Sequence, residues 1–286
     1  IGGSFRIPEI MAKSGAILKE VGSTNRTHAY DYEKAIGKNT ALLLKVHTSN
    51  YKIVGFSAEV ELARIVAIGR KHKLPVMEDL GSGALIDLSQ YGLPKEPVVA
   101  ERVRMGADVV TFSGDKILGG PQAGLAVGRK NWIARMNKNP LKRALRCGKL
   151  TLGALEATLR LYRQSRQIEQ DIPTLRAFTR PSAEIEEIGE SVLPRLKQAL
   201  GSGYRLSLED SVSQIGSGAL PTEEIPTKVI AIEHLEIGAE KIAQRFRQAD
   251  PPILGRIKDK RFLLDLRTTF DPEDLIPNFK DSDVGN

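Results

Sequence analysis

Short apolar segments alternate with helical patterns along the first half of the chain. Runs rich in Val, Ile and Leu have the length of buried strands, and we expect strands at residues 15–21, 41–47, 76–80, 107–112 and 125–127. Between the second and third of these, residues 57–73 carry apolar side chains at helical spacing, with Ser57 as the expected N-cap. The alternation predicts an α/β domain with a mostly parallel sheet flanked by helices.

The pattern changes in the second half of the chain. An amphipathic helix is expected over residues 152–168, and the segment 171–181 (DIPTLRAFTRP) then has the proline punctuation of a domain junction. Beyond it, the pattern predicts helices at 183–200 and 237–248 and strands at 229–232 and 261–266. We therefore expect two domains, a larger α/β domain over 1–165 and a small C-terminal α+β domain over 166–286.

Composition narrows the class of protein. The chain has 286 residues, of which 41% are hydrophobic, enough for a sizeable buried core. No apolar stretch reaches the roughly 18–20 residues of a membrane-spanning helix, and the N-terminus does not read as a signal peptide. A single cysteine, Cys147, excludes an intrachain disulfide and a cysteine-based metal cluster. These features favour a soluble protein of the cytoplasm.

The positive charge is concentrated in one segment. The formal net charge is +7, yet residues 131–180 alone contain eleven Lys or Arg and three acidic residues. No acidic residue lies between Asp115 and Glu156. An anion is the natural partner of such a stretch. The alternative is a solvated basic helix face that binds no ligand.

Polar or glycine-rich segments follow the predicted strands at 78–83 (EDLGSG), 113–116 (SGDK) and 119–124 (GGPQAG). In open α/β sheets, ligands bind beyond the carboxyl ends of the strands. Asp79 and Lys116 each lie at such an end. The pair suits pyridoxal phosphate, because a lysine amine forms a Schiff base with the aldehyde and a carboxylate keeps the pyridine nitrogen protonated. Taken singly, the acid is better explained as a helix cap and the lysine as a solvated loop residue.

Other catalytic motifs fit the sequence less well. Gly81-Ser82-Gly83 begins like a dinucleotide-binding fingerprint, but Ile86 occupies its third glycine position. The sequence contains neither the phosphate-binding motif G-x-x-x-x-G-K-[ST] nor the nucleophile motif G-x-S-x-G, and its four histidines lack the mutual spacing of metal ligands. We therefore expect no metal site, and zinc chemistry and a Ser-His-Asp hydrolase are disfavoured.

Four tracts carry a resemblance to a known family. The chain resembles bacterial L-seryl-tRNA(Sec) selenium transferase, also called selenocysteine synthase, in residues 20–36 (EVGSTNRTHAYDYEKAI), 45–56 (KVHTSNYKIVGF), 76–88 (VMEDLGSGALIDL) and 112–130 (FSGDKILGGPQAGLAVGRK). The resemblance implies a fold type I pyridoxal-phosphate-dependent transferase, with residues 1–165 as the remainder of its large cofactor domain. The implied activity converts L-seryl-tRNA(Sec) to L-selenocysteinyl-tRNA(Sec) with selenophosphate, through an aldimine of pyridoxal 5'-phosphate and an aminoacrylyl intermediate.

The resemblance also implies roles for individual residues. Lys116 matches the Schiff-base lysine, Asp79 the partner of the pyridine nitrogen, and Asp115 a catalytic participant. Ser113 and Asn50 are implied to bind the cofactor.

Two arginines are implied to bind the substrate. Arg143 and Arg146 match family arginines near the active site that would receive the anionic selenium donor. On one helix, their i,i+3 spacing puts both guanidinium groups on the same face, which suits an oxyanion. The resemblance further implies a homo-oligomer built from dimers.

The start of the chain departs from the family pattern. The family has a small N-terminal tRNA-recognition domain and the opening part of the cofactor domain before the tract IGGSFRIP (1–8), where this chain begins. We therefore expect an N-terminally incomplete polypeptide that lacks part of the phosphate cradle and cannot hold the cofactor normally by itself. The alternatives are a related fold type I pyridoxal-phosphate lyase acting on a free amino acid or amino sugar acid, and an inactive fragment whose basic segment binds RNA.

Overall fold

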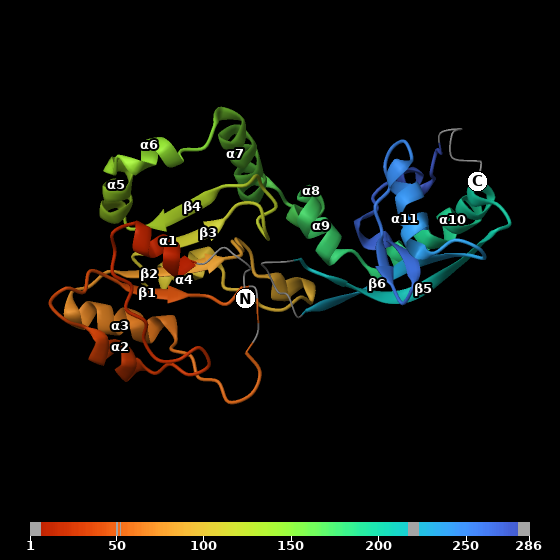
Figure 1. Ribbon diagram of the computed structural model, residues 1–286. Helices are drawn as coiled ribbons and strands as arrows, with labels where there is room; N and C mark the ends of the chain where they lie inside the picture. Colours follow the sequence, from red (N-terminus) through yellow and green to blue (C-terminus); the bar gives the residue numbers. More distant parts are fainter. Residues whose placement is uncertain (1–6, 50, 52, 217–222, 280–286) are drawn as a thin grey trace. The chain divides into compact units, whose positions relative to one another are not determined.

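The chain forms two compact units (Figure 1). The computed structural model describes residues 7–49, 51, 53–216 and 223–279. The first unit extends to Thr174, and the second begins at Leu175. Within these described ranges, no helix combines the length and the apolar character needed to cross a membrane.

The first unit is built on a four-stranded sheet in the order β1-β2-β3-β4. The first three strands are parallel, and β4 runs antiparallel to β3. The strands are β1 (Leu43–Val46), β2 (Val76–Gly81), β3 (Val109–Ser113) and β4 (Gly124–Gly128). Its helices are α1 (Ile7–Lys13), α2 (Ala29–Ala35), α3 (Leu62–His72), α4 (Val99–Arg104), α5 (Lys130–Lys138), α6 (Leu141–Leu145), α7 (Lys149–Gln164) and α8 (Ile168–Asp171), with a 3₁₀ turn at Leu88–Tyr91. The mostly parallel sheet flanked by helices is confirmed.

Helix α3 packs on the sheet through the apolar face that the sequence predicts. Leu62, Ile65 and Val66 are buried in the same core cluster as the strand residue Val76. Gly69 lies on this face too, and a Cβ atom at Gly69 would lie 2.6 Å from Cγ2 of Val76. Glycine at position 69 therefore lets the helix approach the strand more closely than a residue with a side chain would. Burial of each aliphatic side chain at this contact stabilises the fold by about 1.5–3 kcal/mol.

The start of α3 differs from the prediction. The helix begins at Leu62 and not at Ser57. The reason lies in the backbone of Ala58, whose N–H donates to the carbonyl of Asn25 at 3.0 Å and whose carbonyl accepts from the N–H of Thr27 at 2.9 Å. Because the Ala58 carbonyl already accepts a hydrogen bond from Thr27, it does not accept the intrahelical bond that a helix starting at Ser57 would need.

The predicted strand at residues 15–21 is wrong. These residues form no strand in the structure, and the side chain of Ile17 is 95% exposed. A strand needs a neighbour for its amide and carbonyl groups. None of the strands in the described part of the chain pairs with this segment.

The second unit is an antiparallel sheet in the order β5-β6-β8-β7, covered by helices. Its strands are β5 (Tyr204–Gln214), β6 (Glu224–His234), β7 (Arg256–Lys258) and β8 (Arg261–Asp265). Its helices are α10 (Ser182–Leu200), α11 (Ala239–Gln248) and the 3₁₀ turns Leu266–Thr268 and Pro272–Leu275; α9 (Pro173–Thr179) contains the division between the units. The core contains Ile185, Val192, Leu196, Ile230, Ile232, Phe246 and Phe262. This small α+β domain was predicted.

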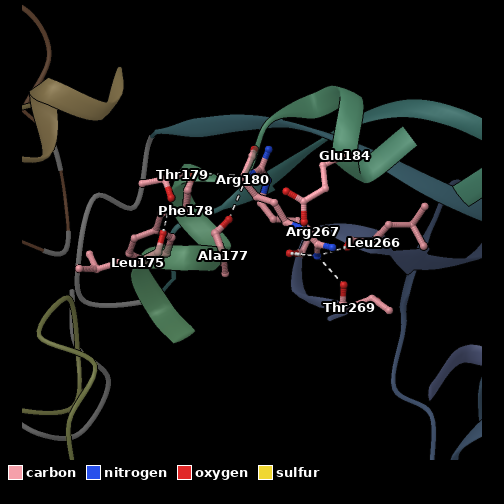
Figure 2. A network of polar contacts seen from close by, with 9 residues as sticks. All are labelled: Leu175, Ala177, Phe178, Thr179, Arg180, Glu184, Leu266, Arg267 and Thr269. Atoms are coloured by element: carbon pink, nitrogen blue, oxygen red, sulfur yellow. Dashed lines mark hydrogen bonds and ion pairs between the residues drawn. The ribbon is translucent and has the colours of Figure 1, made fainter. Parts of the chain in front are cut away.

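Two buried arginines link the entry into α10 to the turn after β8 (Figure 2). The side chain of Arg180 donates to the carboxylate of Glu184 at 2.8 Å and to the main-chain carbonyls of Leu266 (3.3 Å), Arg267 (3.2 Å) and Thr269. The three contacts to carbonyls join segments nearly ninety residues apart in sequence.

Arg267 makes the reciprocal contacts. Its guanidinium donates to the carbonyls of Ala177 (2.9 Å), Phe178 (3.3 Å), Arg180 (3.1 Å) and Pro226. Burial lowers the pKa of Arg267, since the charged form loses its hydration. Main-chain carbonyls therefore replace much of the water around this cation.

Candidate active site

Asp79 lies near the carboxyl end of β2, where the sequence places it. Its carboxylate is half-buried and accepts a hydrogen bond from the Thr111 hydroxyl at 2.9 Å. Thr111 is the residue opposite Asp79 on the neighbouring strand β3. The parallel register thus places the Thr111 hydroxyl where it fixes the orientation of the Asp79 carboxylate.

Lys116 reaches the same end of the sheet from the loop after β3. Its Nζ atom lies 3.6 Å from the position that a Cβ atom on Gly81 would occupy. The hydroxyl oxygen of Ser49 lies only 2.7 Å from that position. Gly81 also has φ of +68°, a conformation that other residues adopt rarely. The absence of a side chain at Gly81 therefore leaves the space into which the lysine amine and the serine hydroxyl extend.

The remaining predicted cofactor residues stand as follows. Ser113 is the last residue of β3 and is half-buried, and its carbonyl lies 2.5 Å from the position of a Cβ atom on Gly83. Asp115 is exposed beside Lys116. Asn50 lies outside the described residues. The structure therefore brings Asp79 and Lys116 to one edge of the sheet, while the roles of Ser113, Asp115 and Asn50 stay predictions.

The two predicted substrate arginines do not share a helix. Helix α6 ends at Leu145, and Arg146 is its C-cap, with an extended backbone at ψ of 138°. The inference that i,i+3 spacing puts Arg143 and Arg146 on one helix face is therefore wrong. Both residues are exposed, and among the residues that the structure describes neither has an ion-pair partner. Their role in binding stays a prediction.

Three polar residues near this edge were not identified from the sequence. His47 follows β1, and its Nε2 atom lies 3.5 Å from Oε2 of Glu96. Ser82 follows β2, and its hydroxyl donates to the same oxygen of Glu96 at 2.7 Å. His47 and Ser82 carry a signal like the one that pointed to Asp79, a polar residue at the carboxyl end of a strand. Glu96 lies in a loop with no such signal, and only the fold brings it here.

These features define the class of protein first. A mostly parallel sheet, with a lysine after one strand and an aspartate at the end of its neighbour, is the arrangement of fold type I pyridoxal-phosphate-dependent enzymes. The solved structure of D-glucosaminate-6-phosphate ammonia-lyase shares this fold, with a TM-score of 0.56 at 22% sequence identity over 91% of this chain and 61% of that chain.

The sequence then identifies the family. The family model of L-seryl-tRNA selenium transferase matches residues 1–270, and the chain belongs to this family. The L-seryl-tRNA(Sec) selenium transferase of Geobacter metallireducens is 52% identical over 273 residues, which are 96% of this chain and 59% of that protein. The enzyme of the same name from Edwardsiella ictaluri is 49% identical over 279 residues, 96% of this chain and 60% of that protein. The chain thus spans about three-fifths of the length of these curated relatives.

Proposed function

We propose that this chain is part of an enzyme that converts L-seryl-tRNA(Sec) to L-selenocysteinyl-tRNA(Sec), with selenophosphate as the selenium donor and pyridoxal 5'-phosphate as the cofactor. The observation that carries the proposal is the approach of the Lys116 amine to the end of β2, two residues beyond Asp79. Membership of the selenium transferase family supports it and does not favour the alternative of a lyase for free amino acids.

The residues at this edge fit the chemistry of the cofactor. A primary amine, a carboxylate and an open space at Gly81 are what a pyridoxal aldehyde and a pyridine nitrogen require. The cofactor, when bound, supplies an electron sink for bond changes at the α-carbon of the amino acid. Lys116 would hold it through Nζ, and Asp79 would hold a proton at the ring nitrogen. Thr111 keeps the Asp79 carboxylate in one orientation through its hydroxyl.

Proton transfer falls to Lys116. When it does not hold the cofactor, Nζ of Lys116 would take the proton from the seryl α-carbon. The half-buried position of Lys116 keeps the amine at the strand end, and we propose that exposed Asp115 takes part beside it. Ser113 and Asn50 complete the proposed cofactor contacts.

Anion binding falls to the basic segment. Arg143 and Arg146 are exposed and unpaired within the described chain, so both guanidinium groups are available to an oxyanion such as selenophosphate. Residues 131–155 of this segment contain no acidic residue to repel the phosphates of a tRNA acceptor end. This supports one shared anion-binding region for the selenium donor and the tRNA.

The proposal extends to assembly and location. Leu145 and Leu150 are 79% and 90% exposed, and none of the residues of α5, α6 or α7 is buried. Exposed apolar side chains of this kind support a homo-oligomer built from dimers. We also propose a cytoplasmic location and a division into residues 1–165, the remainder of the large cofactor domain, and residues 166–286, the small domain.

Replacing the lysine tests the proposal. In the full-length protein, Lys116→Ala is expected to abolish the visible absorbance of bound cofactor and to lower turnover of seryl-tRNA(Sec) by about 10³-fold or more, because it removes the amine that approaches Gly81 at the end of β2. Lys130→Ala, which changes an exposed lysine at the start of α5, is the control and is expected to keep both. Cofactor absorbance retained in Lys116→Ala would overturn the assignment.

Substrate choice separates the alternatives. Seryl-tRNA(Sec) with selenophosphate is expected to give selenocysteinyl-tRNA, measured with labelled selenium, whereas free serine or an amino sugar acid is expected to be inert. Turnover of a free amino acid without use of the tRNA would favour the lyase. Absence of cofactor absorbance from the unmodified full-length protein would favour an inactive polypeptide.

A further inference from the structure

A buried carboxylate lies between the loops that follow β1 and β2. Glu96 is 4% exposed, and its Oε2 atom accepts a hydrogen bond from the Ser82 hydroxyl at 2.7 Å. The same oxygen lies 3.5 Å from Nε2 of His47, and that buried nitrogen has no hydrogen-bond partner within the described residues. Burying a carboxylate is unfavourable unless donors face it, so the two side chains that face Glu96 are held near it.

Both loops held by Glu96 continue directly to the proposed cofactor site. On the β1 side, the N–H of His47 donates to the carbonyl of Asp79 at 2.8 Å, and the carbonyl of His47 accepts from the N–H of Ser49 at 3.0 Å. The hydroxyl of Ser49 then packs against Gly81. A displacement of His47 would therefore shift the serine that lines the space at the end of β2.

On the β2 side, the carbonyl of Ser82 accepts a hydrogen bond from the N–H of Ile117 at 3.2 Å. Ile117 is the residue after Lys116. Ser82 thus contacts Glu96 through its hydroxyl group and the loop that carries Lys116 through its main-chain carbonyl. Lys116 Nζ also lies near Gly81, the residue before Ser82.

We propose that Glu96 is a positioning residue for the Lys116 site. It acts through Ser82 and His47, and it sets where the lysine amine and the Ser49 hydroxyl lie at the end of β2. This inference rests on the proposed function, because it assumes that Lys116 is the residue that binds the cofactor. A long His47–Glu96 separation is consistent with this role, since contacts at catalytic sites often shorten only when the ligand is bound.

Replacement of Glu96 separates positioning from a purely structural role. Glu96→Ala removes the acceptor for the Ser82 hydroxyl, whereas Glu96→Gln keeps both the length and an acceptor oxygen. The matched controls are Asp108→Ala and Asp108→Asn. Asp108 is also a buried carboxylate of this sheet, but it precedes β3 at the opposite end, where it accepts from the N–H of Val76 at 2.8 Å.

The first readout is the reactivity of Lys116 in the cofactor-free, full-length protein. Each variant is treated briefly with a small amine-modifying reagent, and labelling of Lys116 is measured by mass spectrometry relative to the exposed Lys130. We expect Glu96→Ala to raise the labelling rate at least about fivefold, because a loop released by about 1 Å exposes a half-buried amine. Glu96→Gln is expected to restore most of the protection, and both Asp108 variants are expected to match the unmodified protein.

The second readout is turnover by the loaded enzyme. We expect Glu96→Ala to lower kcat about tenfold or more with KM for seryl-tRNA(Sec) nearly unchanged, because misplacing a reacting amine affects the chemical step more than binding. Glu96→Gln should recover most of kcat. Urea unfolding of each variant confirms that the labelled protein is folded.

The outcomes are distinct. Equal Lys116 labelling in Glu96→Ala and the unmodified protein would overturn the positioning role, as would equal increases in Glu96→Ala and Asp108→Ala. Neither result depends on the cofactor. By contrast, failure of the unmodified protein to attach pyridoxal phosphate at Lys116 would overturn the proposed function, whatever the labelling shows.

Discussion

The two buried arginines of the second unit predict a large stability effect at one position. Arg267→Met keeps an unbranched side chain but removes the donors that reach four main-chain carbonyls. Three belong to Ala177, Phe178 and Arg180, which Figure 2 draws, and the fourth belongs to Pro226. These carbonyls come from two separate stretches, residues 177–180 and Pro226. Because Arg267 is only 4% exposed, water cannot replace the lost donors without opening the turn.

The magnitude follows from two opposing contributions. A buried polar group left without a partner costs about 1–3 kcal/mol, so several carbonyls together would cost more than 4 kcal/mol. Replacement by methionine removes the cost of burying a cation. In the native protein this cost is evident because burial lowers the pKa of Arg267. We therefore expect a net loss of about 3 kcal/mol in the free energy of unfolding of this unit.

This loss in the free energy of unfolding is measured by amide hydrogen exchange at increasing urea concentrations below the unfolding transition. The exchange is followed in peptides from β6 and β8. Arg247→Met is the control, because Arg247 is an exposed arginine of α11 and its replacement is expected to change stability by less than about 0.5 kcal/mol. Trp132 is the only tryptophan of the chain and lies in the first unit, so its fluorescence follows that unit separately. A loss of less than about 1 kcal/mol, or an equal loss in Arg247→Met, would refute the reasoning.

Three further predictions concern the first unit. Gly81→Ala is expected to weaken binding of pyridoxal phosphate about tenfold, as measured by absorbance titration. The added Cβ atom would enter the space beside the lysine amine, and φ of +68° costs an alanine about 1 kcal/mol. Unchanged affinity would contradict this prediction. Glu78→Gln is expected to lower the urea-unfolding free energy by about 3 kcal/mol, because the carboxylate is fully buried and binds Arg102 through two contacts of 2.7 and 2.8 Å; a loss below about 1 kcal/mol would contradict it. Replacing Arg143 and Arg146 together by alanine is expected to raise the KM for selenophosphate about tenfold or more and to leave cofactor absorbance unchanged; an unchanged KM would count against their role.

Much of the first unit could be predicted from local patterns. The strands β1, β2 and β3 are short segments in which at least half of the residues are apolar and at least half are buried, so composition identifies them. The edge strand β4 was also predicted, although its antiparallel direction depends on how the chain returns from β3. Helix α10 was predicted within one residue because its apolar face is continuous over nineteen residues.

Other elements could not be predicted because distant contacts decide them. Residues 57–61 have the composition of a helix start, yet the loop around Asn25 takes their hydrogen bonds. Strand β5 was missed, since its side chains are only half-buried and their polarity alternates weakly. Its eleven pairs with β6 hold it in place, and these pairs are not visible in the segment itself.

The sequence by itself determined the parallel sheet, the pairing of Asp79 with Lys116 as candidate cofactor residues, and the family. These conclusions rest on apolar runs and on polar residues directly after them, which depend on neighbours in sequence. Only the tertiary structure decided that Thr111 orients Asp79, that Gly81 leaves room for the lysine amine, and that Arg146 lies beyond the end of its helix. Glu96 reaches the site through loop packing alone, because hydrogen bonds between segments far apart in sequence leave no periodic pattern in either segment.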